Sequence, residues 1–356
     1  MKIRSMKRST RTNLITYLGV IIAFVATVIL RDSGGLSRSL TGQLVPICCY
    51  MSMAVSLNLT VGILGELSLG HAGFMSVGAF SGVIAAMSLQ SAIPSDALRL
   101  AVAMIVGAAV AAVAGVVIGT PVLRLRGDYL AIVTLAFGEI IKELVNCLLV
   151  GWDSRGLHVA LNLTGDKSIA DLGLETEGIA IIKGAQGATS TATISTFTAG
   201  FVLVLITLFV VLNLKDSRAG RAIMALRDNS IAAESVGLNL TKYKLMAFVT
   251  SAALAGAAGA LYGLNFSSLQ ASKFDFNTSI LILVFVVLGG LGNIWGSLIA
   301  AAALTILPEA LRQFSDYRML VYAIVLILVM LLTNNPTLRS VLSRLRPGAS
   351  KEKEAA

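Results

Sequence analysis

The stretch SLNLTVGILGELSLGHAGFMSVGAF, residues 56–80, decides how the rest of the chain is interpreted. It lies among long apolar runs, yet it carries Asn58, Glu66 and His71, which a lipid-facing helix avoids, together with five glycines. Backbone that breaks at membrane depth survives only where protein buries it or where it lines a water-filled cavity. We therefore expect two membrane spans that meet at a glycine break near residues 62–70, with the polar side chains turned away from lipid.

The composition is that of an integral membrane protein. The chain has 356 residues, of which 56% are hydrophobic and 13% charged, and its mean hydropathy is +0.84. A soluble domain carries about 25% charged residues and could not cover such an apolar surface. The net charge of +9 does not indicate nucleic-acid binding, because the basic residues cluster beside the apolar runs, as in membrane proteins of fixed orientation. The three cysteines lie inside apolar runs, so no disulfide framework is expected.

Apolar runs recur along the chain at the length of about 20 residues that crosses a hydrocarbon core. We predict an all-α polytopic membrane protein with about ten transmembrane helices. The expected spans are 14–31, 41–61, 66–90, 98–120, 129–150, 198–214, 244–264, 278–292, 294–309 and 319–333. A second glycine break at 289–292, within GGLGNIWG, separates two of them; without this break the segment 278–309 would be one span and the total nine.

Charge predicts the orientation, because basic flanks stay in the cytoplasm. The tails 1–13 and 336–356 are both basic, so both termini should be cytoplasmic and the number of spans even. No A-x-A cleavage site follows the first apolar run, which we expect to be an uncleaved span. Between the tails lies one transmembrane domain, residues 14–335, with an irregular outer loop at about 151–197 and a basic inner loop at about 215–243.

The inner loop holds a short structured polar segment. A cap at 228–230 can start a helix, residues 231–236 supply about two turns, and Gly237 offers a left-handed stop. One interpretation is a solvated connector anchored to anionic membrane lipid. The other is a surface for docking a protein, favoured by a small-residue patch beside charges. Its residues are Arg221, Arg227, Asp228, Asn229, Ala232, Ala233, Glu234 and Gly237.

The span 129–150 carries Glu139, Lys142, Glu143 and Asn146, whose spacings of 3, 4 and 7 place them on one helix face. Glu139 should lie near mid-membrane, where a charge costs several kcal/mol unless it pairs or meets water. Two interpretations stay open: internal pairing of Glu139 with Lys142, or the lining of a path for a polar substrate. The candidate path residues are Asn58, Glu66, Ser68, His71, Glu139, Lys142, Glu143 and Asn146.

The remaining sequence features predict structural roles and not catalysis or metal binding. His71 has no second His nearby, and the chain shows no phosphate loop, HExxH or GxSxG motif, so we predict no catalytic residue, no metal site and no ATP site on this chain. Small residues at every fourth position let helix backbones approach closely. The glycines expected at such packing faces or at breaks are Gly62, Gly65, Gly70, Gly78, Gly82, Gly259, Gly263, Gly290 and Gly292.

Four runs, in this order, resemble the LivM-type permease of branched-chain amino acid ABC importers. They are LNLTVGILGELSLGHAGFMSVGAF (57–80), GDYLAIVTLAFGEIIK (127–142), GRAIMALRDNSIAAESVGLNLTKYKLMAF (220–248) and VVLGGLGNIWGSLIAAAALTILPE (286–309). The resemblance covers residues from about 45 to 335. The runs GWDSRGLHVALNLTGDKS (151–168) and TNNPTLRS (333–340) depart from the family pattern, and the first bears on the outer docking surface.

The resemblance implies a subunit of the bacterial inner membrane with several partners. These are a LivH-like second permease, two cytoplasmic ABC ATPases that bind ATP and Mg, and a periplasmic binding protein that delivers the substrate. Residues Ala232, Ala233, Glu234 and Gly237 resemble the coupling loop that docks into the ATPase.

The expected function is therefore transport of leucine, isoleucine, valine or a related small solute, and not an enzymatic reaction. A permease for urea or short amides is an alternative, since urea importers use closely similar permeases. A second alternative is a stand-alone secondary transporter or channel with Glu139, Lys142 and His71 as an ion relay. A membrane-embedded enzyme would need a nucleophile with a base, or a metal-ligand cluster, and the chain offers neither pattern.

Overall fold

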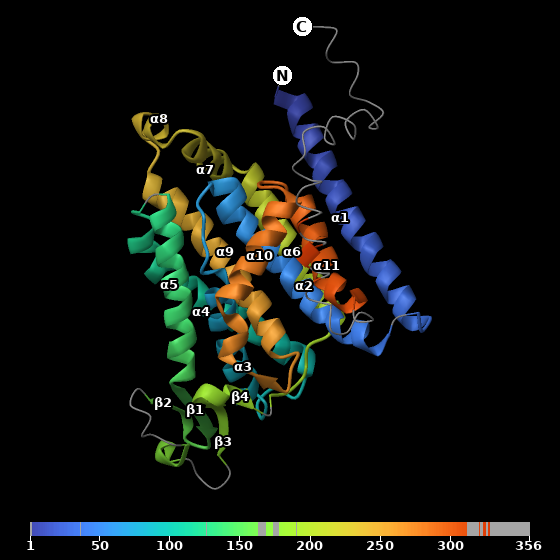
Figure 1. Ribbon diagram of the computed structural model, residues 1–356, viewed down its shortest axis with the longest axis vertical. Helices are drawn as coiled ribbons and strands as arrows, with labels where there is room; N and C mark the ends of the chain where they lie inside the picture. The colour runs from blue at the N-terminus through green and yellow to red at the C-terminus, as the bar shows by residue number, and fades with distance from the viewer. Residues whose placement is uncertain are drawn as a thin grey trace. The chain divides into compact units, whose positions relative to one another are not determined.

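The computed structural model describes residues 2–35, 37–125, 127–162, 169–173, 178–189 and 191–311, with the single positions 320, 323, 324 and 327. The chain divides into two units, residues 1–302 and 303–356. The first unit is a bundle of helices with a small β-sheet at one end (Figure 1). In the second unit, the described residues are mainly the last turns of one helix. Most of the predicted span 319–333 and the tail 336–356 lie outside the described residues.

The helices occupy nearly all of the described apolar runs. They are α1 (Lys2–Asp32), α2 (Arg38–Asn58), the π-helix η1 (Leu59–Leu64), α3 (His71–Ser88), α4 (Asp96–Val122), α5 (Asp128–Asn146), α6 (Phe197–Asp216), α7 (Arg218–Asp228), α8 (Ser230–Ser235), α9 (Leu240–Gly263), α10 (Phe276–Gly289) and α11 (Ile294–Ala310), with short 3-10 turns η2 (Ile169–Leu172), η3 (Gly184–Gln186) and η4 (Ala271–Phe274).

Six helical segments of the described chain are long and apolar enough to cross a membrane. They are Arg38–Leu64, His71–Ser88, Asp96–Val122, Phe197–Asp216, Leu240–Gly263 and Ala271–Gly289, and a shorter apolar helix follows at Ile294–Glu309. Each matches a predicted span to within several residues, so the prediction of a mostly helical membrane protein is confirmed. The total of about ten spans stays a prediction, as does the cytoplasmic placement of both termini.

Helices α3, α4 and α9 pack backbone to backbone. A β-carbon added at Gly78 would overlap the backbone of Gly256, and one added at Gly259 would overlap the carbonyl of Met75. A β-carbon at Gly82 would meet the side chain of Ala260. Helices that approach this closely make many van der Waals contacts. These contacts hold membrane helices together, because the hydrophobic effect does not favour helix association within lipid. The structure thus places Gly78, Gly82 and Gly259 at helix packing faces.

The loop after α5 folds into a sheet, which corrects the prediction of an all-α fold with an irregular outer loop. The strands are β1 (Leu148–Asp153), β2 (Gly156–Leu161), β3 (Ile179–Lys183), β4 (Ala188–Thr189) and β5 (Ser268–Leu269), antiparallel in the order β2-β1-β3-β4-β5.

The first strand of this sheet, β1, explains why the end of the preceding membrane span was predicted too late in the sequence. The register of β1 and β2 pairs Asp153 with Gly156 across a tight turn, and Leu148 with Leu161 at the far end of the hairpin. The apolar residues LLV at 148–150 look like the end of a membrane helix, because a short apolar run does not distinguish helix from strand. The predicted span 129–150 therefore ends earlier, at Asn146.

The glycine contacts predict a large cost for a bulkier residue. Gly78→Val would push methyl groups into the backbone of Gly256, and overpacking of this kind should lower the melting temperature by roughly 5 °C or more. Gly42→Val in α2 is the control, because a β-carbon at Gly42 meets no atom within 4 Å. The measurement is thermal unfolding of the detergent-purified protein. Equal melting temperatures for the two variants would mean that α3 and α9 are not in backbone contact.

Candidate functional site

Helices α7 and α8 form a helical hairpin at the end of the bundle away from the sheet (Figure 1). The amide side chain of Asn229 lies between them and accepts hydrogen bonds from the backbone N–H groups of Ile231 (3.1 Å) and Ala232 (3.0 Å), so that α8 begins there. Gly237 has a φ of +84°, and the N–H of Leu238 donates to the carbonyl of Ala233 at 3.1 Å, which closes the helix.

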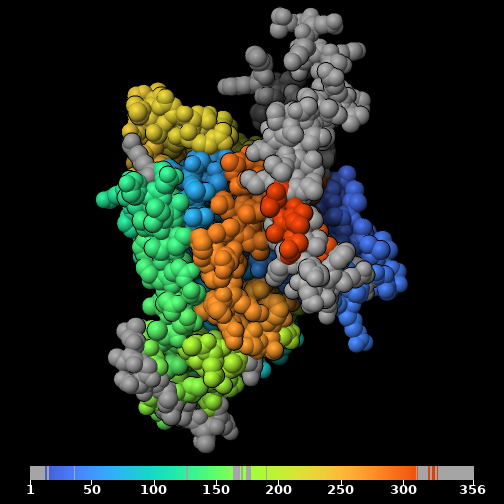
Figure 2. All heavy atoms as spheres, viewed as in Figure 1, coloured from blue at the N-terminus to red at the C-terminus, as the bar shows by residue number. Residues whose placement is uncertain are grey.

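Helix α8 and the residue that follows it expose apolar side chains. Ile231 in α8 and Val236 directly after it are each 75% exposed, whereas Ala233 is buried. Glu234 adds an exposed carboxylate. In the space-filling view α7 and α8, in yellow, lie on the surface at one end of the bundle, and the green residues of the sheet lie at the other (Figure 2). Together the two apolar side chains give the hairpin an exposed apolar surface that a protein partner can cover.

Arg227, near the end of α7, reaches the break between α2 and α3. Its Nη1 donates to the carbonyl oxygen of Gly62 at 2.7 Å. Its methylene groups lie against Gly65, where a β-carbon would overlap them. Gly65 also has a φ of +82°, so glycine is required there both by conformation and by the arginine stem.

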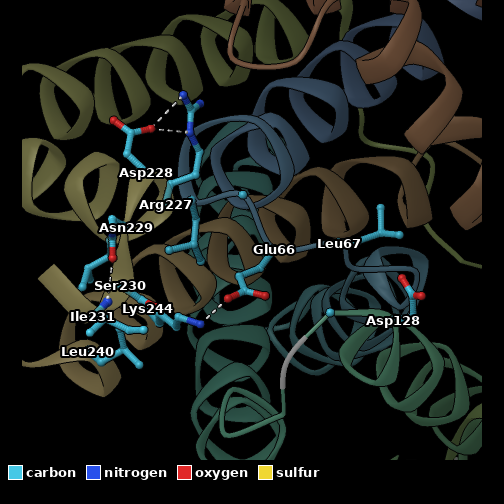
Figure 3. Close-up of a pocket in the computed structure, with 14 residues that line it drawn as sticks. Glu66, Leu67, Asp128, Arg227, Asp228, Asn229, Ser230, Ile231, Leu240 and Lys244 are labelled. Carbon is cyan, nitrogen blue, oxygen red and sulfur yellow. Dashed lines mark hydrogen bonds and ion pairs between the residues drawn. The ribbon is translucent and has the colours of Figure 1, made fainter. Parts of the chain in front are cut away.

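Glu66 follows directly and forms an ion pair with Lys244 in the second turn of α9 (Figure 3). The side chains are 15% and 8% exposed, so the pair is largely buried and each charge depends on the other. A pocket of about 590 Å³ lies beside it, and its lining includes Gly65, Asp128, Arg227 and Asn229. The structure therefore brings Glu66 to the hairpin end of the bundle.

Asn58 joins the two helix breaks. Its side chain is fully buried; Oδ1 accepts from the backbone N–H of Gly292 at 2.8 Å, and Nδ2 donates to the Ser297 hydroxyl at 2.7 Å. Gly290 and Gly292 have φ values of +93° and +78° in the turn between α10 and α11. Both breaks expected from the sequence are thus present, one between η1 and α3 and one between α10 and α11.

His71 lies in the bundle core. Its Nε2 is 2.8 Å from the hydroxyl of Ser56, and the Ser251 hydroxyl donates to the Ser56 carbonyl at 2.6 Å. Ser68 is also buried, and its hydroxyl has no hydrogen-bond partner among the described residues. Within the described part of the chain, no group of three or more His, Cys, Asp or Glu side chains is placed to hold a metal ion.

The polar face of α5 lies toward the sheet end. Glu139 forms an ion pair with Lys142 and accepts from the backbone N–H of Phe276, the first residue of α10, at 3.2 Å. Glu143 is 66% exposed on its side chain, and Asn146 donates to it at 3.2 Å. The helix α5 ends at Asn146 and not at residue 150, so Glu139 lies two turns from its end and three turns from its start. Its expected place near the middle of the membrane stays a prediction.

In the described part of the chain, the predicted path residues therefore fall into three places. Asn58, Ser68 and His71 are in the core, Glu66 is at the hairpin end, and the four α5 residues are toward the sheet end. Sequence reasoning missed Lys244 and Ser297, the partners of Glu66 and Asn58. The available signal was weak: each is a polar residue at the edge of an apolar run, with its partner far away in the chain.

Comparison with known proteins identifies the family. Residues 39–330 match the family described as branched-chain amino acid transport system / permease component. The high-affinity branched-chain amino acid transport system permease protein LivM of Salmonella typhimurium is 34% identical over 292 residues, which cover 79% of this chain and 66% of that protein. LivM of Escherichia coli is 33% identical over 319 residues, or 86% of this chain and 72% of that protein.

A shorter similarity links the chain to sugar permeases. The ribose import permease protein RbsC of Haemophilus influenzae is 31% identical over 129 residues, which cover 34% of this chain and 40% of that protein. No solved structure matches the chain.

The matched range contains both helix breaks, the α7–α8 hairpin and the polar face of α5. This chain belongs to the family of permease components of branched-chain amino acid transport systems.

Proposed function

We propose that this chain is the membrane-spanning permease subunit of an ATP-driven, binding-protein-dependent importer of branched-chain amino acids in a bacterial inner membrane. The observation that carries the proposal is the family match over residues 39–330, together with the two LivM relatives at 33% and 34% identity. The six membrane-spanning segments of the described chain support the location. The chain acts as a transporter subunit, with leucine, isoleucine or valine as the solute.

The α7–α8 hairpin is the proposed docking surface for the ATPases. Two cytoplasmic ABC ATPase subunits bind ATP and Mg, and one of them covers Ile231 on α8 and Val236 directly after it. The exposure of these two apolar side chains supports this role, as does the separation of α8 from the sheet. The substrate then arrives from a periplasmic binding protein at the sheet end.

The start of α1 supports the same orientation. Asn13 donates to the carboxylate of Asp216 at the end of α6 at 2.7 Å, and α6 leads directly into α7. The beginning of α1 therefore lies on the hairpin side of the bundle. With the hairpin in the cytoplasm, the basic N-terminal tail is cytoplasmic too, as its charge predicts.

The polar face of α5 is the proposed contact with the LivH-like second permease. Glu143 is exposed on this face, and Ile140 and Leu144 are exposed beside it on the same helix. A charged side chain in contact with lipid is costly, so a protein partner or water should cover it. We place the substrate path along this face, with Glu139 and Lys142 lining it from this chain.

Deleting the chain from its host should abolish ATP-dependent uptake of radiolabelled leucine, isoleucine and valine. The affinity-tagged chain should also co-purify with two ATPase subunits and a second permease. Recovery of transport by the chain alone in liposomes would establish a stand-alone transporter or channel instead. Loss of urea or acetamide uptake, with amino acid uptake intact, would contradict the proposed substrate.

Ile231→Asp in α8 should reduce co-purification of the ATPases by about tenfold or more, because it places a charge in an apolar interface. The chain itself should insert and melt normally, since the side chain is 75% exposed. Leu157→Asp in β2 is the matched control: Leu157 is exposed as well, but it lies in the sheet. Unchanged ATPase recovery with Ile231→Asp would remove α8 from the interface.

Glu139→Gln should impair uptake while leaving the protein folded. The glutamine can still accept the hydrogen bond from Phe276, and a part-exposed ion pair adds little stability, so the melting temperature should change by no more than about 2 °C. Uptake by the assembled importer and thermal unfolding are measured on the same preparation. A large loss of stability with normal uptake per folded molecule would mean that Glu139 serves only to pair with Lys142.

A further inference from the structure

Two polar contacts, one before helix α8 in the chain and one after it, both end on one short segment of the bundle. Arg227 comes just before α8 and binds the carbonyl of Gly62. Lys244 comes after α8, in α9, and pairs with Glu66. We call residues 62–66 the receiving segment. The chain on either side of α8 is therefore fixed to the same five residues at the break between η1 and α3.

The Arg227 contact is directional. The guanidinium–carbonyl hydrogen bond is 2.7 Å long, and the methylene stem fills the space that a side chain at Gly65 would need. A charge-assisted hydrogen bond to a fixed backbone carbonyl is among the stronger polar contacts in proteins. A displacement of α7 thus acts directly on the backbone of the receiving segment.

The Glu66–Lys244 contact is buried. Only 15% of the Glu66 side chain and 8% of the Lys244 side chain are exposed. Separating such a pair leaves two uncompensated charges in a poorly solvated place, which costs far more than opening a surface pair. The start of α9 and the receiving segment should consequently move together.

The receiving segment in turn contacts the second helix break. A β-carbon at Gly62 would overlap both the Asn58 side chain and the backbone N of Gly292. Asn58 holds the same Gly292 N–H at 2.8 Å. Close-packed interiors transmit displacements because there is no empty space to absorb them.

We propose that the receiving segment takes up the movement that the ATPase imposes on α8, and that Arg227 and the Glu66–Lys244 pair are the transmitting contacts. Through Gly62 the movement reaches the α10–α11 turn, so that both helix breaks shift together. This assigns Glu66 to coupling and not to the substrate path. The inference rests on the proposed ATP-driven importer and specifies how its docking surface is connected to the membrane helices.

The test uses the complete importer, purified through a tag on this chain and reconstituted in liposomes. Arg227→Met keeps the methylene stem beside Gly65 and removes only the hydrogen bond to Gly62. It should lower amino acid uptake per ATP hydrolysed by about tenfold, and the amount of bound ATPase is measured on the same preparation. Glu66→Lys should have at least the same effect, because it places two cations together.

Exchanging the charges of Glu66 and Lys244 distinguishes a role of this pair in coupling from a role in folding alone. The double variant Glu66→Lys with Lys244→Glu restores the opposite charges and should recover most of the uptake per ATP. Lys242→Met is the matched control, because Lys242 lies in the first turn of α9 with its side chain exposed; it should behave like the unchanged protein.

Normal uptake per ATP in Arg227→Met and Glu66→Lys would overturn the inference. Loss of ATPase binding or of folded chain in Arg227→Met would also overturn it, because the contact would then hold the structure and not transmit movement. Failure of the proposed function gives a different result: the unchanged complex would show no ATP-dependent amino acid uptake at all.

Discussion

Inside a membrane, a helix that stops must find partners for its free amide and carbonyl groups, because no water reaches them. This chain interrupts its helices at two places and satisfies the freed groups there with side chains from other elements. Asn58 binds the N–H of Gly292, Arg227 binds the carbonyl of Gly62, and the Thr134 hydroxyl accepts the N–H of Leu69 at 3.0 Å. The breaks therefore determine which helices must lie side by side.

The bundle combines two kinds of contact with different mechanical properties. Helices α3, α4 and α9 meet through glycines such as Gly78 and Gly256, with no side chain between the backbones. Because these backbones are already in contact, one helix cannot shift without displacing the others, so the three helices should move as one body. The breaks are held mainly by polar contacts, namely the hydrogen bonds of Asn58 and Arg227 and the Glu66–Lys244 ion pair, which connect one element to the next. Movement during transport should concentrate at the breaks, next to the hairpin that the ATPase would bind.

Sequence reasoning worked where the relevant physics is local. Apolar runs predict membrane helices because their length matches the bilayer, and Asn229 and Gly237 predict the ends of α8 because capping involves only neighbours. Contacts between distant parts of the chain left no such pattern. Glu66 and Lys244 are 178 positions apart, and no feature of either sequence segment indicates that the two side chains form an ion pair.

The sheet was missed for a related reason. Its strands are short apolar runs, and their strand character comes from pairing with one another, not from their own residues. The last strand, β5, comes from the connection between α9 and α10, far from the hairpin of β1 and β2. The end of the span 129–150 was predicted four residues too late for the same cause, because the apolar start of β1 made α5 look longer.

The position of β5 also bears on how the protein is made. Ser268 pairs with Thr189, and between them the ribosome must synthesise α6, α7, α8 and α9. Since a chain emerges from its N-terminus, the hairpin of β1 and β2 can form early, whereas the edge of β4 that pairs with β5 stays open until β5 is made. The sheet is complete only after α9 has been synthesised. Its closure is thus a late step in biogenesis, and a finished sheet marks a chain in which α6 to α9 are already made.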